Sequence, residues 1–192
     1  VSFDLSKGPT KKSYTYVFTN PSEETLTFYS HFGEDLGYYT EPLAEMEWTM
    51  VEDSTANVLG YECIMAESDY HGRHWKAWFA PEIPMSFGPW KLHGLPGLIL
   101  KAEADGGFSF MATGLEHSDR IITPMYLQLD YEKVDRKKAL ENAEFFVNNE
   151  ESIMNAQGQN MKIYTLDENG NKVEVPKYDG LKHSLEPDYK MK

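Results

Sequence analysis

Residues 81–97 form a stretch that no regular helix or strand can accommodate. Four prolines lie in it, Pro81, Pro84, Pro89 and Pro96, together with three glycines. Proline fixes φ and lacks a backbone donor, so neither a helix interior nor a central strand continues through such a run. The stretch is nevertheless rich in large apolar side chains, which a disordered linker lacks. We therefore predict an ordered loop that packs by its own side chains against a β structure.

The end of this loop has the residues of a tight turn. In residues 95–98, Pro96 has the φ that the second position of a type II turn requires, and Gly97 can supply the positive φ of the third. We expect this turn to direct the next strand into a sheet. We also expect Trp90, Leu92 and Leu95 to fold the loop over the apolar face of that sheet.

The segments on either side of the loop have the composition of β-strands. Aromatic and β-branched residues are dense in them, several alternate between apolar and polar, and turn residues such as Asp-Gly-Gly and Asn-Gly separate them. The expected strands are 14–19, 25–31, 45–52, 60–67, 73–80, 98–103, 108–115, 121–131, 161–166 and 172–175. In 45–52 the alternation puts Met46, Trp48 and Met50 on one face, as in a half-buried strand.

The hydrophobic period changes once, in residues 135–151. Apolar residues recur there at helical spacing: Ala139, Leu140, Ala143, Phe146 and Val147. Asp135 is the expected N-cap. One helix among mostly antiparallel strands predicts a mainly β (α+β) fold, a curved antiparallel sheet or partial barrel with one packed helix. With 192 residues, of which 41% are hydrophobic, we expect a single domain over 1–192.

The composition excludes several kinds of partner and site. The formal net charge of −13 repels a phosphate backbone, so nucleic acid is not an expected partner. No run approaches the roughly 18 apolar residues of a transmembrane segment. A single cysteine allows neither an internal disulfide nor a thiolate zinc site.

That cysteine, Cys63, is expected to be a packing residue. It shares a strand face with Tyr61 and Met65, and a small thiol in apolar surroundings is inert. If the neighbouring strand pairs Glu67 with His74, Cys63 lies opposite a tryptophan and has no histidine beside it to act as a base.

No familiar catalytic signature occurs: GxSxG, HExxH, GxGxxG, the P-loop and CxxC are all missing. His71 and His74 lie three residues apart, and two imidazoles can begin a metal site, but spacing ties no further ligand to them. We therefore predict no metal and no other cofactor. Arg73, between the two histidines, is also suited to hydrogen-bond loop carbonyls.

A group of aromatic residues follows these histidines. Trp75, Trp78, Phe87 and Trp90 lie within sixteen residues of one another. Such a group either lines an apolar pocket or forms part of the core, and the sequence is compatible with both. These four residues and Arg73 are the candidate binding residues.

A series of motifs in fixed order covers residues 48–115. The motifs are Trp48, Gly60-Tyr61-Glu62-Cys63, Ala66, Gly72-Arg73, Ala77-Trp78-Phe79, Glu82-Ile83-Pro84, Gly88-Pro89 and Gly94-Leu95-Pro96-Gly97-Leu98-Ile99-Leu100. The series resembles the GLPGLI family, whose name is the string at 94–99. The resemblance implies an exported bacterial protein, in the periplasm or on the cell surface, whose signal peptide has been removed and for which no activity or site residue is assigned. The strand pattern is also similar to the open half-barrels of periplasmic lipoprotein carriers.

Three functions remain open on these grounds. The leading one is a non-enzymatic binding or carrier module for an apolar ligand or a protein partner, at the aromatic face near Trp75, Trp78 and Trp90. The alternatives are a structural or assembly protein of the cell envelope, and a hydrolase-like or metal-dependent enzyme with a site near His71, Arg73 and His74. A carrier requires an apolar cavity of several hundred Å³ that is open to solvent, and a filled sheet interior contradicts it.

Overall fold

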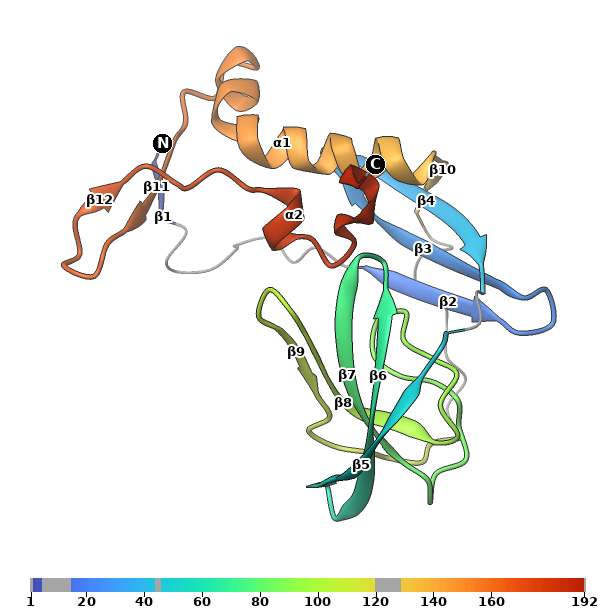
Figure 1. Ribbon diagram of the computed structural model, residues 1–192. Coiled ribbons are helices and arrows are strands. Elements are labelled where there is room, and N and C mark those ends of the chain that lie inside the picture. The colour runs from blue at the N-terminus through green and yellow to red at the C-terminus, as the bar shows by residue number, and fades with distance from the viewer. Residues whose placement is uncertain (1, 5–14, 44–45, 120–128, 192) are drawn as a thin grey trace. The chain divides into compact units, whose positions relative to one another are not determined.

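The computed structural model describes residues 2–4, 15–43, 46–119 and 129–191 (Figure 1). Contacts within the chain group it into two compact units. Unit 1 comprises Val1–Tyr16, Phe28–Thr40 and Tyr126–Asp179, and unit 2 comprises Val17–Thr27, Glu41–Met125 and Gly180–Lys192. Each unit is described by itself below. The single domain expected over 1–192 stays a prediction.

The described chain is mainly β, with one long helix, as predicted. Its strands are β1 Ser2–Asp4, β2 Tyr16–Asn20, β3 Thr25–Phe32, β4 Asp35–Pro42, β5 Thr49–Val58, β6 Tyr61–Tyr70, β7 Arg73–Ala80, β8 Leu98–Ala104, β9 Phe108–Met111, β10 Glu132–Lys133, β11 Lys162–Leu166 and β12 Lys172–Val173. The helices are α1 Arg136–Ala156, α2 Gly180–His183 and the 3-10 helix η3 Pro187–Lys190. In the described part of the chain, none of these helices combines the length and the hydropathy of a membrane span.

The strands belong to three sheets, and within the described residues none of the three is a closed barrel. Their orders are β1-β11-β12, β10-β4-β3-β2 and β5-β6-β7-β8-β9. The third sheet is an antiparallel meander that lies wholly in unit 2. Parallel pairing joins β1 to β11 and β10 to β4.

A two-residue turn connects β6 and β7. His71 and Gly72 both have positive φ, of 51° and 79°, and they follow directly on the pair Tyr70 and Arg73, as in a type I′ hairpin. This register puts Met65 opposite Trp78. The predicted pairing of Glu67 with His74 is therefore wrong by two residues, because the turn has two residues, fewer than the five that separate the expected strands 60–67 and 73–80.

Both faces of the unit 2 sheet carry buried apolar side chains. Trp75, Ala77 and Phe79 alternate along β7 and face one cluster, whereas Trp78 and Ala80 belong to a second cluster with Cys63. The first cluster also contains residues of the loop 81–97. Its buried members are Met46, Ala66, Trp75, Ala77, Phe79, Leu92, Leu95, Ile99 and Ala102. The expectation that the loop covers an apolar face of the sheet is confirmed.

The turn predicted at residues 95–98 is wrong in its geometry. Gly97 does not have a positive φ, whereas Gly94 does, at 91°. Glycine is required at 97 because a Cβ there would lie 2.3 Å from the carbonyl oxygen of Ala80. The loop therefore approaches the end of β7 so closely that only a hydrogen atom fits. The positive φ in this segment lies at Gly94 and at Trp90, where it is 55°.

Several predicted boundaries differ from the observed ones. Strand β5 begins at Thr49 and continues to Val58, so Met46 and Trp48 precede it, and Met50 is half exposed. Strand β4 lies in a segment that is not among the expected strands. Most of the strand predicted at 121–131 falls outside the described residues.

Helix α1 begins where the sequence predicts it but ends five residues later. The Asp135 side chain accepts a hydrogen bond of 2.9 Å from the Lys138 backbone N–H, so the predicted N-cap is confirmed. In unit 1, Ala139 packs in a small core with Phe32 and Tyr39. Val147, which belongs to the predicted apolar stripe, is more than half exposed.

Candidate functional site

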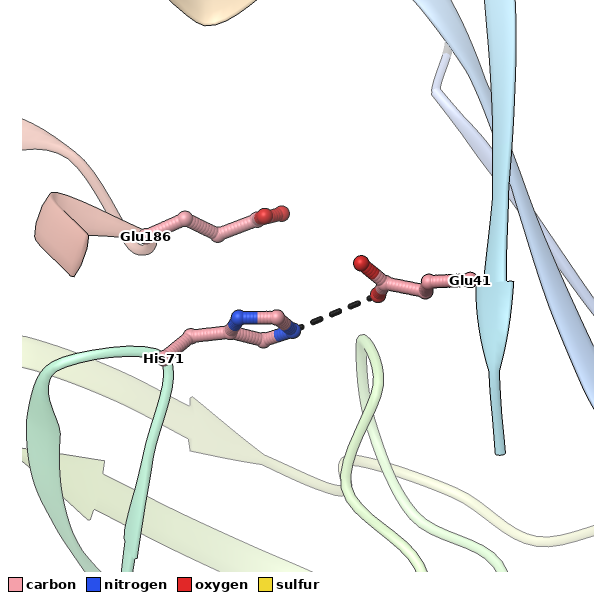
Figure 2. Close-up of side chains that lie close together, drawn as sticks. All are labelled: Glu41, His71 and Glu186. Atoms are coloured by element: carbon pink, nitrogen blue, oxygen red, sulfur yellow. Dashed lines mark hydrogen bonds and ion pairs between the residues drawn. The ribbon is translucent and has the colours of Figure 1, made fainter. Parts of the chain in front are cut away.

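Charged side chains from four segments of unit 2 meet at the β6–β7 turn. Glu41 lies at the end of β4, His71 in the turn, Lys91 in the loop 81–97, and Glu186 and Asp188 in the C-terminal segment. Figure 2 shows Glu41, His71 and Glu186 converging from three of these segments. We call the five residues the ionic cluster.

The imidazole of His71 lies between two carboxylates. Its Nε2 is 3.2 Å from Glu41 Oε1, and its Nδ1 is 3.1 Å from Asp188 Oδ2. Burial lowers the pKa of His71, but the hydrogen bonds to Asp188 and Glu41 outweigh burial and raise the pKa above its ordinary value. The doubly protonated ring is therefore the form that satisfies both carboxylates.

The ammonium group of Lys91 lies at the centre of the cluster. Its side chain is 0% exposed, and Nζ lies 2.7 Å from Glu41 Oε1 and 2.8 Å from Glu186 Oε1. Burial alone would raise the pKa of Glu41, but the hydrogen bond from His71 and the charge of Lys91 lower it to about 2. Glu41 is thus ionised at any physiological pH and accepts from two cationic side chains.

The same geometry bears on metal binding. Ligand atoms of Glu41, His71 and Glu186 lie within 4.8 Å of one another, a spacing at which they could surround a metal ion. The Lys91 ammonium, however, already lies within hydrogen-bond distance of both carboxylates and neutralises them. A metal ion would have to displace this buried cation from both carboxylates. We therefore interpret the cluster as an internal ionic network and not as a metal centre.

The other two residues of the predicted enzyme site lie elsewhere. The side chain of His74 lies on the opposite face of the sheet from Arg73 and is 49% exposed. Its Nδ1 lies 2.8 Å from Asp69 Oδ1. Arg73 is buried, and its guanidinium donates to the carbonyl oxygens of Leu181, Lys182 and Ser184 at 2.6–3.1 Å. Arg73 therefore donates to backbone carbonyls, as the sequence indicates. These carbonyls belong to the C-terminal segment and not to a loop beside the sheet.

The structure does not bring the candidate binding residues together on one surface. Trp75 is fully buried and stacks on Trp90, with ring centroids 5.4 Å apart. Trp78 lies on the other face of the sheet, below Lys101 Nζ at 3.9 Å. Phe87 is exposed. No comparison tests whether these residues bind anything, so their binding role stays a prediction.

Cys63 supplies no nucleophile to the ionic cluster. The thiol is fully buried among the second apolar cluster, on the opposite face of the sheet from Trp75. Burial raises its pKa, which disfavours the reactive thiolate. The packing role predicted for Cys63 agrees with this position.

Sequence reasoning missed four of the five residues of the ionic cluster. Glu41, Lys91, Glu186 and Asp188 are far apart in the chain, and no spacing rule joins them. Only His71 was singled out, and its true partners are not its sequence neighbours. A buried lysine could not be recognised either, since an isolated lysine in a loop is ordinarily exposed.

A second candidate site is a groove in unit 1. It has a volume of about 650 Å³ and lies between helix α1 and the β11–β12 hairpin. The lining residues are Val147 to Ser152, Lys162 to Tyr164 and Lys172 to Lys177. They include three lysines, three glutamates and several apolar side chains. This volume falls within the ordinary range of ligand sites, roughly 300–1,000 Å³.

Hydrogen bonds attach both the hairpin and the segment that follows it to α1. The Glu151 carboxylate accepts from Lys162 Nζ at 3.0 Å and from the Ile163 backbone N–H at 2.8 Å. These bonds lower the pKa of Glu151. Asn148 donates to the Tyr178 carbonyl at 2.9 Å and accepts from the Tyr178 N–H at 2.7 Å. The two sides of the groove are therefore fixed to each other at two points.

Strand β12 borders this groove and is an outer strand of its sheet. The Asp167 N–H donates to the Asn171 carbonyl at 2.9 Å, and Thr165 pairs with Val173. In an antiparallel ladder, residues whose backbone groups bond to the partner strand alternate with residues whose backbone groups point away from it. The backbone groups of Lys172 and Glu174 therefore point away from β11, and Pro176 shortly afterwards removes a donor.

Comparisons with known proteins give a family match over part of the chain and a similarity of fold. The model of a family described as "Protein of unknown function (Porph_ging)" matches residues 65–101, a stretch that includes the string at 94–99. A comparison with curated proteins gives no match.

Two solved structures are similar to the chain in fold. "Structure of PNGF-II in C2 space group" has a TM-score of 0.55 and 15% identity, and covers 72% of this chain and 26% of that one. "Structure of PNGF-II in P21 space group" has a TM-score of 0.53 and 15% identity, with 71% and 26% covered. The chain thus spans about a quarter of the PNGF-II chains. The comparisons support a family of unknown function over residues 65–101 and a shared fold, and neither names an activity.

Proposed function

We propose that this chain is a non-enzymatic binding module whose partner is a polypeptide, bound as an extended segment in the unit 1 groove. The observation that carries the proposal is the groove of about 650 Å³ between α1 and the β11–β12 hairpin. Its two sides are fixed to each other through Glu151 and Asn148, so the site exists before a partner arrives. A site formed in advance loses less conformational entropy on binding.

The lining of the groove favours a polypeptide over an apolar small molecule. Val147 and Val173 offer exposed apolar surface, while lysines and glutamates lie among them. An apolar ligand would exclude water from those charged groups, at a cost in free energy. An extended peptide presents apolar side chains, polar side chains and backbone groups together. It can also pair with the outward backbone groups of Lys172 and Glu174, as in strand addition.

The aromatic face that the sequence favoured is less suited to a ligand. Leu92 and Leu95 fill the space above Trp75, and Trp90 stacks on it. A carrier of the half-barrel kind requires an open apolar cavity at that place. This packing moves our proposal from an apolar ligand to a protein partner.

The enzyme alternative has weak support. Both ring nitrogens of His71 face carboxylates, so neither is directed at an open position where a substrate could bind. The role in cell-envelope assembly is compatible with a polypeptide partner and stays an alternative. The exported location, periplasmic or on the cell surface, is part of the proposal, and fractionation of the producing cells tests it.

Site-specific photo-crosslinking tests the proposed function. A photoreactive residue replaces Val173, which is 39% exposed at the groove, or in the control Leu59, which is 43% exposed at the β5–β6 turn of unit 2. In extracts of the producing cells, we expect Val173 to crosslink to a defined polypeptide and Leu59 not to. Equal labelling at both positions, or no polypeptide adduct at Val173, would contradict the proposal.

A groove-filling variant sharpens this test. Ser152 lines the groove, so Ser152→Trp is expected to abolish the adduct at Val173. Phe145→Trp is the matched control, because Phe145 lies on the same helix, is exposed and is not part of the lining. An adduct that survives Ser152→Trp would show that the partner does not occupy the groove.

A further inference from the structure

The C-terminal segment of unit 2 lies against the β6–β7 turn. It contains α2 and η3, and although it is short, Pro187 and Tyr189 are almost fully buried. The Asp188 N–H points at the His71 carbonyl at 3.4 Å. A Cβ on Gly72 would lie 3.0 Å from the Asp188 nitrogen, so the segment and the turn are in close contact.

The first anchor of this segment does not depend on pH. Arg73 donates to the carbonyl oxygens of Leu181, Lys182 and Ser184, and the guanidinium remains charged at every pH at which a protein is folded. Neutral carbonyls accept these bonds. Residues 181–184 are therefore held in the same way in acidic and in alkaline solution.

The second anchor is ionic and includes one group that titrates near neutrality. His71 contacts Asp188 at 3.1 Å, and Lys91 contacts Glu186 at 2.8 Å. The charged groups that face His71 are Glu41 from β4, Lys91 from the loop, and Glu186 and Asp188 from the C-terminal segment. Three carboxylates thus surround two cations, and only one of these cations is a histidine.

We propose that residues 186–191 act as a pH-dependent latch, which is closed on the β6–β7 turn while both ring nitrogens of His71 carry a proton and loosens when the ring becomes neutral. A neutral imidazole has a single N–H, so one of its nitrogens then presents a lone pair to a carboxylate. Asp188 or Glu41 loses its hydrogen bond, and the net charge of the ionic cluster changes from −1 to −2. Loosening uncovers the surface on which Pro187 and Tyr189 pack.

The direction of the pH dependence follows from the environment of His71. Its pKa is raised above the ordinary value of 6.5, so protonation stabilises the closed latch. This stabilisation is fully present below pH 6.5 and is lost as the pH rises through the higher folded-state pKa. The latch is therefore tight in mildly acidic solution and looser in alkaline solution, while the Arg73 anchor holds in both.

Hydrogen exchange of the whole chain, followed by mass spectrometry, tests the latch. With intrinsic rates corrected, we expect protection of residues 186–191 to fall about tenfold between about pH 5.5 and about pH 9, the size of one charge-assisted hydrogen bond. Protection of residues 181–184 is expected to stay constant. Constant protection of 186–191 across this range, or an equal fall in both segments, would overturn the proposal.

Two variants identify the responsible group. His71→Asn keeps a side chain that tolerates the positive φ at this position, and it should remove the pH dependence. If that variant does not fold, Asp188→Asn removes the partner carboxylate and should also flatten the profile. His74→Gln is the control, since His74 contacts Asp69 and not the C-terminal segment. A pH dependence that persists in Asp188→Asn, or one that disappears in His74→Gln, would refute the assignment to His71.

Discussion

Removal of the Lys91 charge is expected to destabilise unit 2 by about 3–5 kcal/mol. Lys91→Met keeps the length of the side chain and leaves Glu41 and Glu186 facing each other without their shared cation. At an effective dielectric constant of about 20, each ammonium–carboxylate contact at 2.7–2.8 Å contributes roughly 6 kcal/mol of Coulomb energy. In Lys91→Met no ammonium has to be removed from water, and this gain offsets most of the lost Coulomb energy. Breaking a buried ion pair therefore typically costs about 3–5 kcal/mol.

Urea unfolding followed by tryptophan fluorescence measures this change. All four tryptophans lie in unit 2, so the signal reports on that unit. The triple variant Lys91→Met, Glu41→Gln, Glu186→Gln removes the unpaired charges, and it should recover most of the lost free energy of unfolding. A loss below about 1 kcal/mol for Lys91→Met, or a triple variant less stable than the single one, would refute the reasoning.

Three further outcomes follow from the structure. Gly97→Ala should destabilise unit 2 by about 1–3 kcal/mol in the same urea assay because its Cβ would lie 2.3 Å from the Ala80 carbonyl oxygen, whereas the Cβ of Gly88→Ala would lie 2.8 Å from side-chain atoms of Ile99, a longer contact that should cost less. Cys63 should react with a thiol reagent far more slowly in the folded chain than in urea; equal rates would contradict its burial. Because the pKa of Glu41 is lowered from 4.5 to about 2, its ionised form stabilises unit 2 above pH 4.5, and this is lost as the pH falls toward about 2; acid titration of Glu41→Gln should lack that component.

Local patterns predicted most of the unit 2 sheet. The strand at 73–80 has the observed bounds, and the hairpin at Gly106 and Gly107 has the positive φ values that its sequence indicates. Period-2 alternation and turn residues are local signals, so a single sequence contains them. Strand β5 was predicted to end too early because Asp53 and Asn57 disfavour strands. Asp53 lies in an irregularity of the pairing with a positive φ, and Asn57 pairs with Glu62 of β6.

The features that could not be predicted depend on contacts between distant segments. Gly97 was assigned to a turn on φ grounds, whereas it is required by the approach of the Ala80 carbonyl, which no local pattern records. The ionic cluster joins residues 41, 71, 91, 186 and 188, and its members became neighbours only through the fold. The groove arises in the same way, from side-chain hydrogen bonds between α1 and a hairpin that follows it.

Native mass spectrometry of the chain, purified from the cells that produce it, tests the proposed binding role most directly. We predict a bound polypeptide that is retained by Phe145→Trp and lost in Ser152→Trp, because only the second change fills the groove. A lipid or another apolar small molecule, bound equally by both variants, would contradict the account.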